Sequence, residues 1–138
     1  MKTVLLFDTN KTLRALYKEE LGDEGYHVYL AKDTMEALAI LKKMPVNILI
    51  TEYQIEPTET YMNLLDLARE VKHIPVIIFT SCPRTFIDCA WWGEMEYVSK
   101  TSNLVVLKET MREMLDYNGC IDRFYRNRGS LKQQELFF

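Results

Sequence analysis

The stretch Thr3-Val4-Leu5-Leu6-Phe7-Asp8 is a short apolar run that ends on an acidic residue, and three later stretches follow the same pattern. The apolar runs occupy residues 3–7, 46–50, 75–79 and 96–99, and the polar residues at their ends are Asp8, Glu52, Thr80 and Lys100. Helical patterns separate the runs, and strands that alternate with helices are typical of a parallel sheet. Such sheets bind ligands beyond the carboxyl ends of their strands. We therefore expect the four polar side chains to share one cleft.

The other segments complete a series of five strands and five helices. Residues 26–30 are rich in β-favouring side chains and predict the second strand. Helical spacing follows Asp8, and Asp33 with Glu36 is a candidate capping box for the next helix. Further helices are expected around residues 61–71, 83–93 and 104–115, with Tyr61, Leu64, Leu65, Ala68 and Val71 facing inward in the first and Ser102 capping the last. The sequence predicts a doubly wound, five-stranded parallel α/β fold.

The composition is that of one ordinary globular domain. Of 138 residues, 48% are hydrophobic and 27% are charged, which favours a folded chain over a disordered one. The net charge of −3 argues against a general nucleic-acid binder, because such proteins carry a basic surface. No apolar stretch approaches the roughly 18 residues of a membrane span, and the first run is too short for a signal peptide. We expect a cytoplasmic protein that contacts neither nucleic acid nor membrane.

Cysteine and histidine positions do not predict a metal or disulfide site. Cys82, Cys89 and Cys120 are odd in number and lack a paired C-x-x-C spacing, which favours reduced thiols. His27 and His73 stand apart from each other and from the cysteines, whereas a zinc site needs three or four converging ligands.

The ordered polar residues resemble the receiver domain of bacterial two-component response regulators, over roughly positions 2–117. That family has two acids after strand one, a phosphoacceptor Asp after strand three, a hydroxyl residue after strand four, and an aromatic residue and a lysine at strand five. By this resemblance the corresponding residues are Asp8 and Thr9 for the acids, Glu52 for the phosphoacceptor, and Thr80, Tyr97 and Lys100 for the switch; Arg14 and Gly93 also fit. The resemblance implies a flavodoxin-like (βα)5 receiver fold in residues 1–118, and a signalling function rather than an enzyme.

Two departures from the family pattern affect the expected chemistry. Thr9 replaces a carboxylate that helps to hold Mg²⁺, which leaves Asp8 and Glu52 as the candidate metal ligands and implies weak or absent binding. Glu52 is one methylene longer than Asp, so its carboxylate lies about 1.5 Å further out. Phosphoryl transfer depends on in-line positioning, where a 1 Å error can cost on the order of a hundredfold. Phosphorylation in the usual way is therefore not expected.

Two further departures concern the rim of the site. Thr101 follows Lys100 where the family usually has proline, and Tyr61 stands where it usually has a glycine. The longer Glu52 side chain is expected to reach toward Thr80 and Lys100 without modification, through charge-assisted hydrogen bonds. The sequence thus suggests a receiver held near one state. It leaves open whether Glu52 mimics the activated state or the site is silent.

Protein contacts are the expected route of output. Trp92 follows the inward-facing Trp91, so it should point away from the core, and tryptophan is enriched at interface hot spots. With Tyr97 it belongs to the surface of helix four, strand five and helix five, where receivers commonly meet partners or dimerise. A histidine kinase, a downstream signalling protein or a second copy is the implied partner. Residues 119–138 form either a helix extension with a frayed end or a short docking segment.

Three functional interpretations remain at this point. The leading one is a stand-alone receiver-like signalling module that acts without usual phosphorylation. A conventional phosphorylatable receiver is the second. The third is a flavodoxin-like cofactor carrier, because the hydroxyl-rich turn 8–12 lies between a strand and a helix, where a phosphate could bind. That turn has no glycine, which counts against close backbone approach to a phosphate.

Overall fold

The computed structural model describes residues 1–54, 56–81, 95–101 and 103–116. Five strands, four α-helices and a π-helical turn at Leu67–Val71 lie in this part of the chain. Their bounds are β1 Thr3–Phe7, α1 Lys11–Asp23, β2 His27–Ala31, α2 Thr34–Lys43, β3 Ile48–Thr51, α3 Glu59–Asp66, β4 Val76–Thr80, β5 Glu96–Ser99 and α5 Val105–Asp116. The predicted strands are confirmed, with ends displaced by at most two residues.

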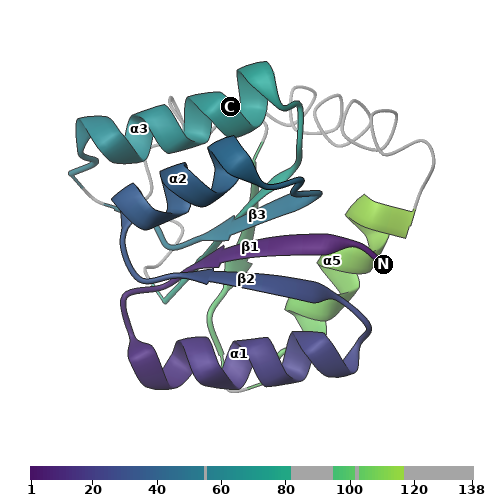
Figure 1. The fold of residues 1–138 in the computed structure, drawn as a ribbon. Helices are drawn as coiled ribbons and strands as arrows, with labels where there is room; N and C mark the ends of the chain where they lie inside the picture. The colour runs from purple at the N-terminus through teal and green to yellow at the C-terminus, as the bar shows by residue number, and fades with distance from the viewer. Residues whose placement is uncertain (55, 82–94, 102, 117–138) are drawn as a thin grey trace, which may run out of the picture.

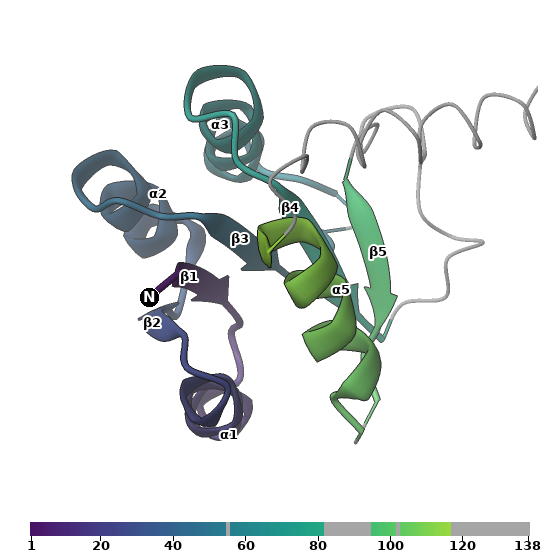
Figure 2. The same cartoon turned by 90° about the vertical axis from the view of Figure 1, so that its right-hand side faces the viewer.

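The strands form one parallel sheet in the order β2-β1-β3-β4-β5. Helices α2 and α3 cover one face of this sheet, and α1 and α5 cover the other (Figures 1 and 2). The order reverses between β1 and β3, which is the switch point of a doubly wound sheet and the usual place for its binding site. The predicted fold class is therefore confirmed.

Alternating strand residues build two separate hydrophobic cores. Leu5, Leu49 and Ile78 pack in the core under α2 and α3. Their neighbours along the strands, among them Leu6 and Ile50, pack in the core under α1 and α5. Burial on both faces explains why the strands are continuous apolar runs instead of alternating ones. Among the described residues, no helix combines the length and apolar character needed to cross a membrane.

One predicted inward position is wrong. Tyr61, Leu64, Leu65 and Ala68 are fully buried as expected, but Val71 is 65% exposed. The reason is a π-helical turn over Leu67–Val71, in which the Lys72 N–H donates to the Leu67 carbonyl at 2.9 Å. A π-turn holds more residues than an α-turn, so it rotates later side chains away from the face set by α-helical spacing.

Several predictions lie outside the described residues. These are the helix around residues 83–93 with Trp92, the cysteines Cys82, Cys89 and Cys120, the Ser102 cap, and the segment 119–138. In the described part of the last helical segment, the side chain of Asn103 accepts a hydrogen bond from the Val105 N–H at 2.9 Å.

Asp33 caps α2 as the sequence suggested. Its Oδ1 accepts from the Glu36 N–H at 2.8 Å, while the Glu36 carboxylate accepts from the Lys32 N–H at 3.4 Å. Because an N-cap acceptor satisfies an otherwise unpaired helix N–H, Asp33→Ala should lower the free energy of unfolding by about 1 kcal/mol. Urea unfolding measures this change, and Asp33→Asn, which keeps an acceptor, should stay near the natural value. An unchanged midpoint in Asp33→Ala would contradict the assignment.

Candidate functional site

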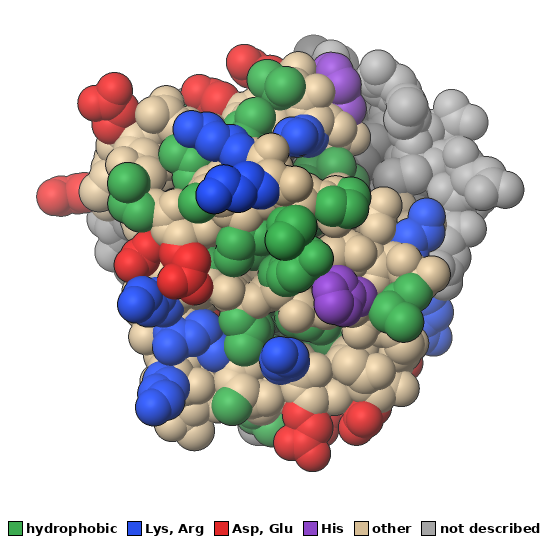
Figure 3. All heavy atoms as spheres, in the orientation of Figure 1, with side chains coloured by type: hydrophobic (Ala, Val, Ile, Leu, Met, Phe, Trp, Pro, Cys, Tyr) green, Lys and Arg blue, Asp and Glu red, His purple; other side chains and the backbone are tan. Residues whose placement is uncertain are grey.

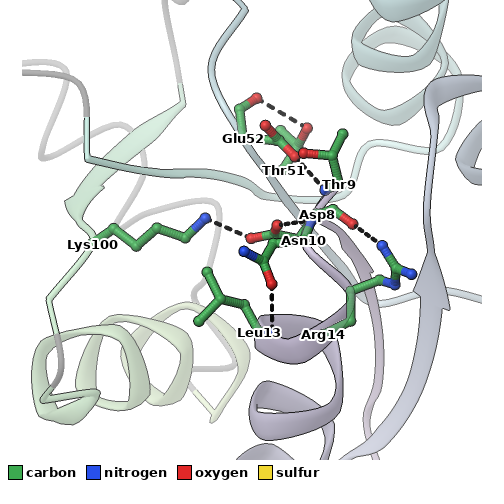
Figure 4. A network of polar contacts seen from close by, with 8 residues as sticks. All are labelled: Asp8, Thr9, Asn10, Leu13, Arg14, Thr51, Glu52 and Lys100. Carbon is green, nitrogen blue, oxygen red and sulfur yellow. Dashed lines mark hydrogen bonds and ion pairs between the residues drawn. The ribbon is translucent and has the colours of Figure 1, made fainter.

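The ends of four strands bring the predicted polar residues to one edge of the sheet. Asp8 follows β1, Glu52 follows β3, Thr80 ends β4 and Lys100 follows β5. Asp8 and Thr80 are among the few buried polar side chains of the described residues. Figure 4 shows Asp8 lying between Lys100 on one side and the end of β3 on the other. The sheet topology therefore assembles the site that the strand ends predicted.

Lys100 forms an ion pair with Asp8. Its Nζ lies 2.5 Å from Asp8 Oδ2, and the two side chains are 17% and 6% exposed. The ammonium also lies over the rings of Tyr17 and Phe79, at 5.9 and 5.7 Å from their centroids. Burial, and to a lesser degree the Asp8 charge, raises the pKa of the Tyr17 phenol. Because an ion pair and two ring faces share the ammonium, Lys100 is held firmly inside the site.

Asp8 makes further contacts that organise the loop after β1. Its Oδ1 accepts from the Asn10 N–H at 2.8 Å, and its carbonyl accepts from Arg14 Nη1 at 2.7 Å. Asn10, not Asp8, is the N-cap of α1, because its side chain accepts from the Leu13 N–H. Asp8 is therefore not the cap of α1, and its contacts lie within the candidate site.

The Glu52 carboxylate takes a contact that the sequence did not suggest. Its Oε1 accepts from the backbone N–H of Thr9 at 2.5 Å. The expected reach of Glu52 toward Lys100 is wrong, because the Lys100 ammonium is paired with Asp8 instead. The two carboxylates have thus divided their partners: Asp8 takes the side-chain cation, and Glu52 takes a backbone donor of the neighbouring loop (Figure 4).

The donor set fits a divalent cation poorly. Mg²⁺ requires hard oxygen ligands in a near-octahedral array. The two candidate ligands Asp8 and Glu52 already accept hydrogen bonds, while Thr9 offers a neutral hydroxyl. Within the part of the chain that the structure describes, no group of three or more His, Cys, Asp or Glu residues converges as a metal site. The Lys100 ammonium supplies the positive charge beside Asp8.

The remaining predicted switch residues lie at or near the same edge. Thr80 is buried, and its carbonyl accepts from the Lys100 N–H at 2.8 Å. Tyr97 on β5 is half-buried and packs against the core under α2 and α3. The Tyr97 side chain is therefore neither fully buried nor fully exposed to solvent.

Tyr61 contacts the candidate site, although the sequence predicted only that it faces inward and stands at the rim where the family usually has a glycine. Its hydroxyl donates to the Glu52 carbonyl at 2.5 Å, and the Thr51 hydroxyl donates to the same carbonyl at 3.2 Å. An inward-facing tyrosine was itself the available sequence indication, since a buried phenol needs a hydrogen-bond partner. Which atom accepts it depended on the path of the chain after β3.

The Tyr61 phenol should make stability fall at alkaline pH. Burial raises its pKa well above the usual value of 10.0, the Glu52 and Tyr53 charges raise it further, and a Thr51 hydrogen bond partly opposes them. Above pH 10.0 the unfolded chain ionises this tyrosine while the folded chain keeps its proton, so the contribution to stability is intact below that pH and is lost as pH rises. The slope from one such group is about 1.4 kcal/mol per pH unit.

Urea unfolding between about pH 9 and about pH 11 measures this effect. The Tyr61→Phe variant should lose stability less steeply than the natural chain over that range. Parallel curves for the two proteins would show that the phenol ionises equally in both states.

Comparisons with known proteins agree with this architecture. The family model of the response regulator receiver domain matches residues 4–112. An NtrX-like response regulator from Rickettsia felis is 28% identical over 111 residues, which are 75% of this chain but 23% of that relative. The chain thus spans less than a quarter of that relative's length.

Solved structures show the same fold. The response regulator protein TrrA from Thermotoga maritima, crystallised with Mg²⁺ and BeF, superposes with a TM-score of 0.72 at 28% identity, covering 83% of this chain and 100% of TrrA. TrrA in complex with the histidine kinase ThkA superposes with a TM-score of 0.71 at 29% identity, covering 83% and 99% of the two chains. The family match, the strand order and the polar residues at the strand ends agree, and this chain belongs to the response regulator receiver domain family of two-component signalling.

Proposed function

We propose that this chain is a receiver-like signalling module that acts through protein contacts and is not phosphorylated in the usual way. The observation that carries the proposal is the internal pairing of the site. Glu52 binds the Thr9 N–H and Lys100 binds Asp8, each at 2.5 Å. Glu52, which would receive a phosphoryl group, and Lys100, which would neutralise its charge, are thus both already paired with residues of the loop after β1.

The position of Glu52 supports this proposal on chemical grounds. A nucleophilic carboxylate must lie in line with the leaving group of the phosphoryl donor. The Glu52 carboxylate instead points at the loop after β1, where it makes a charge-assisted hydrogen bond. Glu52 also brings one negative charge where a phosphoryl group brings about two, so a silent site fits better than a permanently activated one.

Weak or absent Mg²⁺ binding belongs to the same proposal. Asp8 and Glu52 would hold the ion, but Asp8 would have to give up its Lys100 contact to do so. Two carboxylates without a third charged ligand offer little compensation for removing water from Mg²⁺. TrrA, crystallised with Mg²⁺ and BeF, is the contrasting relative.

A protein partner is supported by the complex of TrrA with ThkA and by the surface of this chain. At the start of α5, which belongs to the expected contact surface, Val105 and Val106 are 50% and 59% exposed. Tyr97 of that surface is half-buried, and Trp92 lies outside the described residues. Figure 3 shows acidic and basic side chains interspersed on one face and not a single basic surface. With the net charge of −3, this favours a protein over a nucleic acid. A kinase, a downstream protein or a second copy in the cytoplasm would fit.

Intact-mass measurement after incubation with a small acyl-phosphate donor and Mg²⁺ tests the proposal. We expect no gain of the about 80 Da that one phosphoryl group adds. A gain that disappears in Glu52→Gln would instead make the chain a conventional receiver with Glu52 as acceptor. A gain that persists in Glu52→Gln and disappears in Asp8→Asn would move the acceptor to Asp8. The family assignment favours both receiver interpretations over the flavodoxin-like carrier.

A further inference from the structure

Tyr61 lies in the first turn of α3 and is fully buried. The helix begins after Thr58, whose hydroxyl accepts from the Tyr61 N–H at 3.1 Å. The backbone of Tyr61 is therefore held by the helix cap, and its phenol reaches back to the Glu52 carbonyl at 2.5 Å. The two ends of this tyrosine join the start of α3 to the end of β3.

Glu52 accepts hydrogen bonds at both its backbone carbonyl and its side-chain carboxylate. Its carbonyl accepts from Tyr61 and Thr51, and its carboxylate accepts from Thr9 in the loop between β1 and α1. A continuous series of hydrogen bonds thus runs from α3 through residue 52 to that loop. Asp8, the residue before Thr9, extends the series to β5 through Lys100.

We infer that Tyr61 is a positioning residue: by holding the Glu52 carbonyl, it directs the Glu52 carboxylate onto the Thr9 N–H and so couples α3 to the loop after β1. The inference rests on the proposed function, in which the paired state of Glu52 keeps the site silent.

The geometry of the backbone explains how a contact at the carbonyl controls the side chain. Fixing the direction of a carbonyl fixes the peptide plane, because the peptide bond is planar. Because the backbone of Thr51 is already held in β3, fixing that plane also restricts the rotation about the Cα–C bond of Glu52. The direction of the Cα–Cβ bond is then restricted, so the side chain is held where its carboxylate reaches Thr9. The phenol is suited to this task because a packed tyrosine has only two side-chain torsions to restrict. Its buried environment also excludes water, which would compete for the carbonyl.

The Thr9 amide reports on this coupling directly. Thr9 is exposed, so protection of its N–H from hydrogen exchange must come from the Glu52 contact and not from burial. In the full chain without metal or phosphate donor, Tyr61→Phe should speed Thr9 exchange by roughly five- to tenfold. Exchange of the Leu49 amide in the central strand β3 measures global opening and should change less. Glu52→Gln should speed Thr9 exchange as well, and adding Tyr61→Phe to it should have little further effect.

Tyr29→Phe is the matched control. Tyr29 is a half-buried tyrosine that packs against the same core as Tyr61 but lies on β2. Removing its phenol oxygen should leave Thr9 exchange unchanged. The inference fails if Tyr61→Phe leaves Thr9 exchange within about twofold of the natural rate. It fails equally if Thr9 and Leu49 accelerate together, because Tyr61 would then be a core residue only.

A second variant guards against loss of folding. Tyr61→Met fills similar space with a flexible apolar side chain and has no hydroxyl, and it should reproduce the Thr9 effect. Failure of both variants to fold would also count against a positioning role. Since no phosphate donor is present, these outcomes are independent of the mass measurement. Phosphorylation of Glu52 would refute the proposed function, whereas the role of Tyr61 would still be decided by the Thr9 exchange rates.

Discussion

The double variant Thr9→Asp with Glu52→Asp is expected to take up a phosphoryl group from a small acyl-phosphate donor and Mg²⁺, whereas the natural chain is not. The first change supplies a third carboxylate for the metal, and the second withdraws the acceptor from its contact with the Thr9 N–H. Lys100 and Thr80 already lie at the ends of the neighbouring strands. A phosphoryl group would then find a cation, an ammonium and a hydroxyl around it.

We expect a large gain in phosphorylation because the missing metal ligand at Thr9 and the extra length of Glu52 both raise the energy of the same transition state. A misplacement of about 1 Å can cost on the order of a hundredfold, and loss of a metal ligand adds to it. Intact mass should show a gain of about 80 Da in the double variant, sensitive to chelation of Mg²⁺. Each single variant is the matched control and should gain much less. Full labelling by Glu52→Asp alone would mean that the length of the acid is the sole defect, and no labelling of the double variant would mean that the rim of the site is also unsuitable.

Lys100→Met is expected to destabilise the fold by about 2 kcal/mol. Removing one partner of a buried ion pair leaves the other charge without compensation, and the Asp8 carboxylate is only 6% exposed. The cost stays below that of a fully buried pair because Lys100 is 17% exposed, and methionine keeps the contact with the Tyr17 and Phe79 rings. Urea unfolding should show a lower midpoint with an unchanged slope.

Lys108→Met is the matched control for that measurement. Lys108 on α5 pairs with Glu20 of α1 at 2.9 Å and with Glu24, just after α1, at 3.4 Å, but both acids are well exposed. Such surface pairs contribute little to stability, so the midpoint should scarcely move. Adding Asp8→Asn to Lys100→Met should recover part of the loss, because the uncompensated charge is then gone. A loss in Lys108→Met equal to that in Lys100→Met would contradict the special role of the site pair.

The strand pattern predicted most of the fold. Apolar runs separated by helical spacing specified five parallel strands, and the rule for their connections placed Asp8, Glu52, Thr80 and Lys100 at one edge. The Asp33 cap was predictable because it is a local contact: its acceptor and donor are three residues apart. The exposure of Val71 was not, because the choice of a π-turn over an α-turn depends on how the end of α3 packs.

The partners within the site were decided only by the tertiary structure. Asp8 and Lys100 are 92 residues apart in sequence, and Thr9 and Glu52 are 43 apart. Residue types and spacing determined by themselves that acids, a hydroxyl and a lysine would meet. The helix after each strand returns the chain to the start of the sheet, so all strands run parallel and end at the same edge. Which acid takes the lysine depends on distances of a few ångströms between separate strands and on the direction of the Glu52 peptide plane, and these exist only once the sheet has formed.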